Sequence, residues 1–145
     1  MTKEEKQLLL KDLCARFPYG VKGLHRGQVH ELFTIDGREV NNACIQVDGY
    51  DAWFSVDTFK PYLRPMSSMT DNERGEYRKA FDKDFTILED SLITPIAYKY
   101  ADGTIVRDRI LFNELDWLNE NMFDYRGLIP MGLALEAPEG MYENN

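Results

Sequence analysis

The hydrophobic residues near the start of the chain follow a helical period. Leu10 and Leu13 lie three positions apart, with a phenylalanine four positions further on, and side chains at this spacing share one face of an α-helix. Thr2 and Glu5 have the spacing of a capping box, which begins a helix. A proline and a glycine follow soon after, and both residue types end helices. The pattern therefore predicts a helix over residues 3–16.

The period changes to two between residues 20 and 57, which is typical of strands that are buried on one side. Asp36 and Asp48 each precede a glycine, and Asp-Gly pairs favour turns between successive strands. Prolines flank Tyr62–Leu63, which predicts a final edge strand that curls the sheet. The expected structure is a small antiparallel β-meander or an SH3-like barrel. The alternating apolar residues are Ala43, Ile45, Val47, Ala52, Phe54 and Val56.

Residues after 66 return to helical patterns, with one short hairpin between them. Thr70 and Glu73 form a second capping box, which predicts a polar helix to about Phe81. Apolar residues alternate on both sides of an Asp-Gly pair within residues 96–106, as in a hairpin. Helical spacing returns between residues 109 and 121. The helix there carries Ile110, Leu111, Leu115 and Leu118, with Met122 just beyond it.

Together these elements predict one α+β domain over residues 1–145, a length that suffices for a single core. Residues 1–66 hold the N-terminal helix and the β-module, and residues 67–145 hold the helices, the hairpin and an extended C-terminal tail. The tail segment LIPMGLALEA is apolar but has too little regular structure to pack alone. We expect it to dock on its own chain or on a second copy, so a monomer and a homodimer are both open.

The net charge of −8 belongs to the second half of the chain. Residues 1–65 contain nine basic and nine acidic side chains, whereas residues 66–145 contain eight basic and sixteen acidic ones. An acidic surface repels nucleic acid and attracts basic partners. Direct nucleic-acid binding is therefore not expected. The surface either attracts a basic partner, in one version by mimicking DNA, or only keeps the protein in solution.

Composition and the first residues bear on the compartment. Apolar residues make up 43% and charged residues 29% of the chain, as in globular proteins. Cys14 and Cys44 are too few and too far apart for a disulfide framework, so we expect buried free thiols in a reducing cytosol. The first residues lack the pattern of a signal peptide, and no apolar run is long enough for a bilayer. The expected location is cytoplasmic, away from membranes.

No segment has a spacing that imposes a catalytic chemistry. His25 and His30 lie five residues apart without a cysteine or carboxylate cluster at ligand spacing, so no metal site is expected. The glycines of the tail lack the phosphate-loop and dinucleotide patterns. No serine has a nucleophile-elbow context, and no cysteine neighbours a histidine in sequence. We therefore expect neither catalytic residues nor a cofactor.

Aromatic residues are the better binding candidates. They concentrate around the β-module, and a small barrel with surface aromatics can stack bases or grip a proline-rich peptide. By alternation Phe54 faces the core while Trp53 points the other way, to solvent or beneath a helix. In the tail, Arg126 follows Tyr125 and precedes a glycine, as at a helix exit anchored by an ion pair. The candidate binding residues are Trp53, Tyr62, Tyr125 and Arg126.

Three segments resemble the recurring blocks of a family of small uncharacterised proteins from gut Bacteroidetes genomes and their phages. They are PYGVKG at 18–23, FKPYLRPMSSMT at 59–70 and WLNENMFDYRGLIPMGLALEAPEGMY at 117–142. The resemblance covers roughly half of the chain and is absent from residues 24–57 and 82–116. It implies a phage or mobile-element origin and a cytoplasmic setting. It brings no assigned activity and no catalytic residues.

Two functions from different classes follow. The first is a non-enzymatic binding protein whose acidic half or aromatic β-module engages a host macromolecule, with a host protein as the expected partner. The second is a binder of a small, nucleotide-like ligand that uses the aromatic and arginine candidates for stacking and anion contact. A hydrolase would need convergent carboxylates in a cleft, which the sequence does not indicate.

Overall fold

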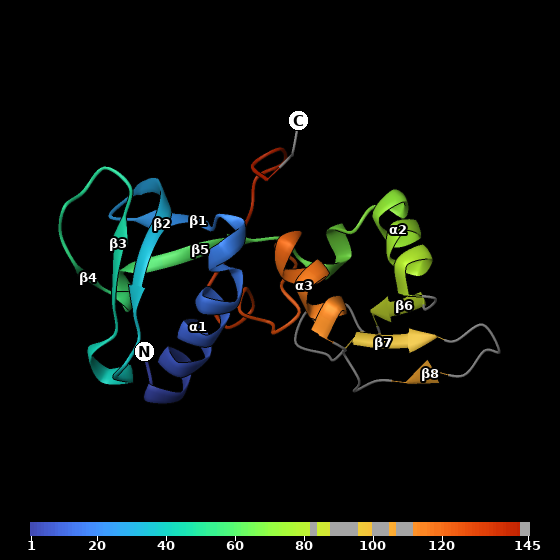
Figure 1. Ribbon diagram of the computed structural model, residues 1–145, viewed down its shortest axis with the longest axis horizontal. Helices are drawn as coiled ribbons and strands as arrows, with labels where there is room; N and C mark the ends of the chain where they lie inside the picture. Colours follow the sequence, from blue (N-terminus) through green and yellow to red (C-terminus); the bar gives the residue numbers. More distant parts are fainter. Residues whose placement is uncertain (82–83, 88–95, 100–104, 107–111, 143–145) are drawn as a thin grey trace.

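The computed structural model describes residues 1–81, 84–87, 96–99, 105–106 and 112–142, and it has an α+β fold. Figure 1 shows two groups of elements along the long axis of the molecule. Helix α1 and a six-stranded sheet form one group, and helices α2 and α3 with a three-stranded sheet form the other. Strand β5 leads from the first group toward the second.

The first group matches the predicted helix followed by strands. Helix α1 spans Lys3–Arg16, and the amide of Glu5 donates to the Thr2 hydroxyl, as the capping box requires. The six strands lie in the order β4-β3-β2-β1-β5-β9, with β9 parallel to β5 and the other pairs antiparallel. Their bounds are β1 Lys22–His25, β2 Gln28–Asp36, β3 Cys44–Val47, β4 Phe54–Ser55, β5 Phe59–Leu63 and β9 Leu135–Glu136.

The sheet is open, so the meander forms but the SH3-like barrel does not. Strand β5 pairs with β1, as closure requires, yet β4 and β9 remain at opposite ends of the strand order. Strand β4 has only two residues, and its ladder pairing is with β3. The segment Tyr62–Leu63 is also not an edge, because β9 from the tail pairs with it on its free side.

Between β1 and β5 the backbones and a ring approach closely at Gly23. This glycine pairs with Pro61, and a methyl group in its place would overlap the ring of the fully buried Phe59. The packing therefore requires a residue without a side chain at this point of the sheet.

The second group contains the two predicted helices and the predicted hairpin. Helix α2 spans Asp71–Phe81, and helix α3 spans Phe112–Glu120. Strands β7 (Ile96–Lys99) and β8 (Ile105–Val106) form the hairpin, and β6 (Asp84–Ile87) adds a third antiparallel strand that the sequence pattern does not indicate. Ile110 and Leu111 lie outside the described residues.

Three apolar clusters hold the described parts together. Leu9, Leu10 and Leu13 of α1 pack on the inner face of the large sheet. A second cluster joins α2, α3 and the turn that follows α3. In the third, Leu63 of β5 packs with the tail. The tail members of this last cluster are Leu128, Leu133 and Ala134, with Ile129 packed against them.

Two expectations about burial need correction. Cys14 is exposed and Cys44 is half-buried, so the prediction of two buried thiols is wrong. On α1 the buried stripe passes through Asp12 and Arg16 instead, which turns Cys14 toward solvent. The sequence also predicts a buried stripe of Tyr77, Ala80 and Phe81 on α2, but Ala80 is exposed and Phe81 is half-buried, whereas Tyr77 is buried.

Candidate functional site

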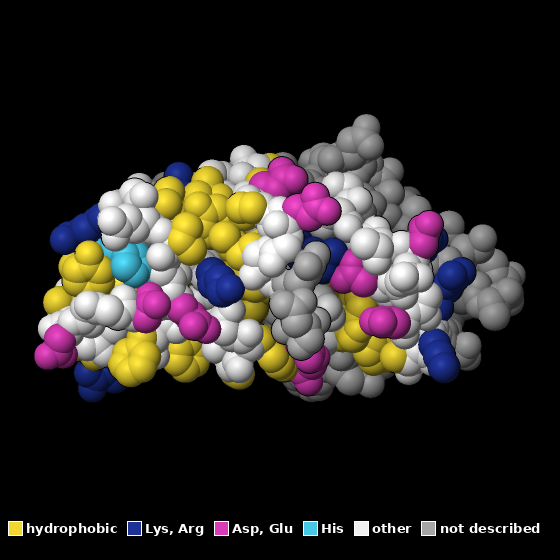
Figure 2. Space-filling view, turned by 90° about the horizontal axis from the view of Figure 1, so that it is seen from above, with side chains coloured by type: hydrophobic (Ala, Val, Ile, Leu, Met, Phe, Trp, Pro, Cys, Tyr) yellow, Lys and Arg dark blue, Asp and Glu magenta, His cyan; other side chains and the backbone are white. Residues whose placement is uncertain are grey.

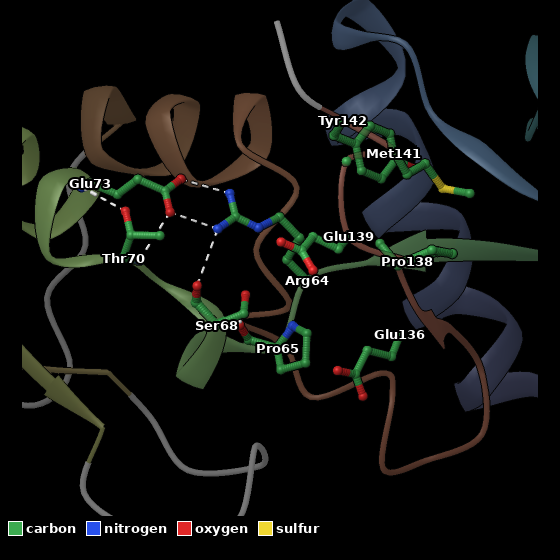
Figure 3. A pocket seen from close by; sticks show the side chains of 12 residues that line it. Arg64, Pro65, Ser68, Thr70, Glu73, Glu136, Pro138, Glu139, Met141 and Tyr142 are labelled. Carbon is green, nitrogen blue, oxygen red and sulfur yellow. Dashed lines mark hydrogen bonds and ion pairs between the residues drawn. The ribbon is translucent and has the colours of Figure 1, made fainter.

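A groove lies where the C-terminal tail passes the start of α2. It has a volume of about 520 Å³, within the range of ligand sites. Figure 3 shows tail residues along one side and Arg64, Ser68, Thr70 and Glu73 along the other. We call it the acidic groove. Its lining residues are Arg64, Pro65, Ser68, Thr70, Glu73, Glu136, Ala137, Pro138, Glu139, Gly140, Met141 and Tyr142.

Arg64 and Glu73 form the inner wall of the acidic groove. Two guanidinium nitrogens of Arg64 each donate to a carboxylate oxygen of Glu73 at 2.6 Å, and the guanidinium lies 4.3 Å from the centre of the Phe123 ring. Such a two-point pair is specific in geometry as well as favourable in energy. The positive charge of Arg64 is therefore already matched within the protein.

The sequence fixes Glu73 at this position through the capping box of α2. Its backbone amide donates to the Thr70 hydroxyl at 3.1 Å, and its carboxylate accepts from the Thr70 amide at 3.0 Å. Burial raises the pKa of Glu73, but the hydrogen bonds from Arg64 and Thr70 outweigh this effect and the net pKa is lowered. Glu73 is thus ionised at neutral pH, with both oxygens occupied.

The backbone of Arg64 is held from the second half of the chain. Its amide donates to the Met122 carbonyl and its carbonyl accepts from the Asp124 amide, both at 2.8 Å. At the preceding residue, Leu63, the carbonyl oxygen accepts a hydrogen bond from the Ala137 amide at 2.7 Å. The end of β5 is consequently bound to two later segments, which brings the tail alongside the start of α2.

Tyr142 fixes the far end of the tail through hydrogen bonds of its hydroxyl to strands β1 and β5. Its hydroxyl donates to the Tyr62 carbonyl at 2.7 Å and accepts from the Lys22 amide at 3.0 Å. The hydroxyl thus bridges Lys22 and Tyr62, the residues next to the pair Gly23 and Pro61 in the register of β1 and β5. Burial raises the pKa of Tyr142 to about 12. The phenol therefore stays protonated at neutral pH.

The acidic groove carries a formal charge of −2, since one arginine stands against three glutamates. Arg64 and Glu73 cancel, so the excess comes from Glu136 and Glu139 on the tail, and both are exposed. Pro65, Pro138 and Met141 supply apolar wall between these charges. The arrangement suits a ligand with a cationic end and an apolar body.

Tyr125 and Arg126 lie together but serve an internal network. Arg126 donates to Asp12 at 2.9 Å, and the guanidinium groups of Arg16 and Arg126 lie 5.1 and 4.9 Å from the centre of the Tyr125 ring. The Tyr125 hydroxyl donates to Asn119 at 2.7 Å. The ring and the hydroxyl of this tyrosine thus both have partners within the protein.

Trp53 and Tyr62 occupy separate places. Trp53 directly precedes β4 and is 51% exposed, whereas Tyr62 is a half-buried residue of β5. No ladder pairing joins their strands, because three strands lie between β4 and β5 in the order of the sheet. None of the four predicted binding residues lines the acidic groove.

Sequence reasoning did not select Arg64, Glu136 or Glu139 as a joint site. The capping box did identify Thr70 and Glu73 as neighbours, because that signal is local. The pairing of β9 with β5, which places the tail glutamates opposite Arg64, joins segments more than seventy residues apart. No local sequence pattern predicts such a pairing.

Comparisons with known proteins found no match to this chain. No family model matches it, and no curated protein or solved structure matches it either.

Among the described residues, no group of three or more His, Cys, Asp or Glu side chains could hold a metal ion. No described helix is both long enough and apolar enough to cross a bilayer.

Proposed function

We propose that the protein is a non-enzymatic binding protein that holds a basic segment of a host protein in the acidic groove. The proposal rests on one observation, which is that the charge of Arg64 is already paired within the protein. Its guanidinium is fully engaged by Glu73 and Phe123. The carboxylates of Glu136 and Glu139 therefore face the groove without a basic residue among its lining to match them.

A lysine or arginine side chain has the chemistry that the groove requires. Its charged end can approach the two tail carboxylates, while its hydrocarbon stem lies along Pro138 and Met141. The surplus negative charge of the second half of the chain also speeds the encounter with a basic partner. The same charge disfavours nucleic acid and anionic ligands.

The proposal also includes a phage or mobile-element origin of the protein. The resemblance of three sequence blocks to phage and mobile-element proteins supports a host protein as the partner. Two of these blocks, residues 59–70 and 117–142, contain every residue that lines the groove except Glu73. Glu73 lies three positions beyond the first of them.

The experiment uses a defined basic probe. A fluorescent hexapeptide of alternating lysine and arginine is titrated with the full chain, and anisotropy is followed at two salt concentrations. We expect saturable binding that weakens with salt. Charge reversal with Glu136→Lys and Glu139→Lys should abolish it. The matched control is Glu4→Lys with Asp51→Lys, which makes the same charge change at exposed positions outside the groove.

The two charge-reversed proteins separate the groove from general acidity. If the control keeps the affinity and the groove variant loses it, the groove is the binding site. If both variants bind equally well, or both lose binding equally, the acidic groove is not a specific site and the proposal is wrong. Melting temperatures of the variants show whether each is folded.

A further inference from the structure

His25 and His30 lie on one face of the β1–β2 hairpin. In the strand register His25 pairs with Gln28 and His30 pairs with Gly23, so the two histidines are diagonal neighbours on the same side. Their ring centres are 6.0 Å apart and the rings are nearly perpendicular. Gly23 opposite His30 has no side chain, which leaves the two rings adjacent.

The proton positions on both rings follow from their partners. Nδ1 of His25 lies 3.2 Å from the Thr58 carbonyl oxygen, and Nδ1 of His30 lies 3.2 Å from a carboxylate oxygen of Asp48. Neither oxygen has a hydrogen to donate, so each Nδ1 must be the donor. In the neutral rings the lone pair is consequently on Nε2 in both histidines.

Both Nε2 atoms are buried and have no hydrogen-bond partner among the described residues. His25 is 1% exposed, and the side chain of His30 is 13% exposed. Leaving two buried acceptors without partners costs free energy. A ligand that binds both nitrogens would remove this cost.

The hydrogen bonds at the Nδ1 atoms of both rings are of the kind that metal-binding histidines make. A histidine that binds a metal through one nitrogen commonly donates its other N–H to a carbonyl or a carboxylate, which fixes the tautomer. His25 and His30 show one partner of each kind. The carboxylate of Asp48 is itself held by the Glu31 amide at 2.9 Å, so the support of His30 is rigid.

We propose that His25 and His30 form a two-histidine site for a divalent late transition-metal ion such as Zn²⁺. Imidazole nitrogen suits zinc, nickel and copper, whereas magnesium and calcium prefer oxygen ligands. The described residues offer no group of three possible ligands. Water or a group from a bound partner therefore completes the coordination, and the affinity is below that of a structural zinc site.

Phe54, Tyr50 and Arg26 lie around the histidine pair. The ring of Tyr50 packs edge-on against His30 and Phe54, and Tyr50 is 47% exposed. Figure 2 shows histidine surface next to a hydrophobic side chain at this end of the molecule. Arg26 lies over Phe54, with its guanidinium 4.6 Å from the ring centre. Tyr50 thus contacts His30, and Arg26 packs on Phe54, whose ring contacts His25.

The test uses the full chain carrying Cys14→Ser, because Cys14 is an exposed thiol that could bind zinc by itself. Any affinity tag is removed first. Zn²⁺ is titrated by calorimetry and the melting temperature is recorded with and without Zn²⁺. We expect binding of one ion per chain and a higher melting temperature with Zn²⁺, because an ion selective for the folded state stabilises it. His30→Gln should remove both effects, and Asp48→Asn should weaken binding about tenfold or more.

A second measurement covers the case in which His30→Gln does not fold. With Cu²⁺ on the otherwise unaltered Cys14→Ser protein, electron paramagnetic resonance should show coupling to two imidazole nitrogens. The proposal is overturned if Zn²⁺ leaves the melting temperature unchanged at millimolar concentration. It is also overturned if folded His30→Gln binds as the parent does, or if the copper spectrum lacks two imidazole nitrogens.

Discussion

The guanidinium of Arg16 donates a 2.7 Å hydrogen bond to the carbonyl oxygen of Phe123, a residue 107 positions later in the chain. The same guanidinium pairs with Asp12 at 2.8 and 3.1 Å, and neither charged side chain has any exposed surface. Arg126 supplies a second positive partner to Asp12. One buried ion pair thus links α1 to the segment that begins the tail.

Removing Arg16 should destabilise the fold strongly. We expect Arg16→Met to lower the free energy of unfolding by about 3 kcal/mol, because a buried charge then loses one partner. The loss falls at the lower end of the usual range, since Arg126 still faces Asp12. Urea unfolding followed by circular dichroism measures it. The control is Arg38→Ala, which removes an arginine whose side chain is 89% exposed. Its urea midpoint should stay unchanged, and equal losses in the two variants would contradict the assigned role of Arg16.

The hydroxyl of Tyr142 should matter although its residue is far from the main core. In Tyr142→Phe the Lys22 amide and the Tyr62 carbonyl lose their shared partner. We expect a loss of about 1–3 kcal/mol in the free energy of unfolding. The matched control is Tyr50→Phe, which removes a hydroxyl from a ring that is 47% exposed. Equal stability of the two variants would show that the hydroxyl does not secure the tail.

The raised pKa of Tyr142 also predicts a dependence on alkaline pH. Its pKa is about 12 in the folded protein against an ordinary value of 10. The protonated form is favoured by folding, so the associated stability is complete below pH 10 and is lost as pH rises toward 12. The difference in stability between the parent and Tyr142→Phe should shrink by about 1 kcal/mol between pH 9 and pH 11. Thermal unfolding at the two pH values measures this change, and a constant difference would contradict the burial of the phenol.

Two glycine substitutions should have opposite signs. Gly23→Ala places a methyl group against the buried Phe59 ring and 2.7 Å from the Lys60 carbonyl oxygen, so we expect a loss of roughly 1–3 kcal/mol. Gly75 lies inside α2 with no atom within 4 Å of an added methyl group. Gly75→Ala should therefore stabilise the protein by about 0.5–1 kcal/mol. Chemical unfolding of both variants decides the signs, and a stable Gly23→Ala protein would contradict the close packing of β1 and β5.

The features that sequence reasoning found are those encoded within a few residues. At Thr2 the hydroxyl accepts from the Glu5 amide as expected, and at Thr70 both bonds of the capping box form. The alternation of Ala43, Ile45 and Val47 correctly gives their buried side. In each case neighbouring residues determine the geometry, so the pattern is complete in the local sequence.

The features it missed depend on distant pairings. The strand order of the open sheet and the pairing of β9 with β5 both depend on segments that lie far apart in the chain. One missed feature did have a local signal. Asp12 and Arg16 lie four positions apart on the face of α1 that carries Leu9 and Leu13, and charges on an apolar helix face indicate a buried pair. The acidic groove had no such local sequence signal, because its two walls come from separate segments of the chain.

The pairing of Tyr142 with the first strand has a consequence for synthesis of the protein. The hydroxyl that joins β1 to β5 reaches Lys22 from 120 residues further along the chain. A nascent chain on the ribosome can form α1 and the local hairpins early, because their contacts lie close in sequence. The outer edge of β5 stays unpaired until the tail emerges. The growing chain therefore presents an open strand edge, a site for mispairing or for chaperone contact, that the finished fold covers.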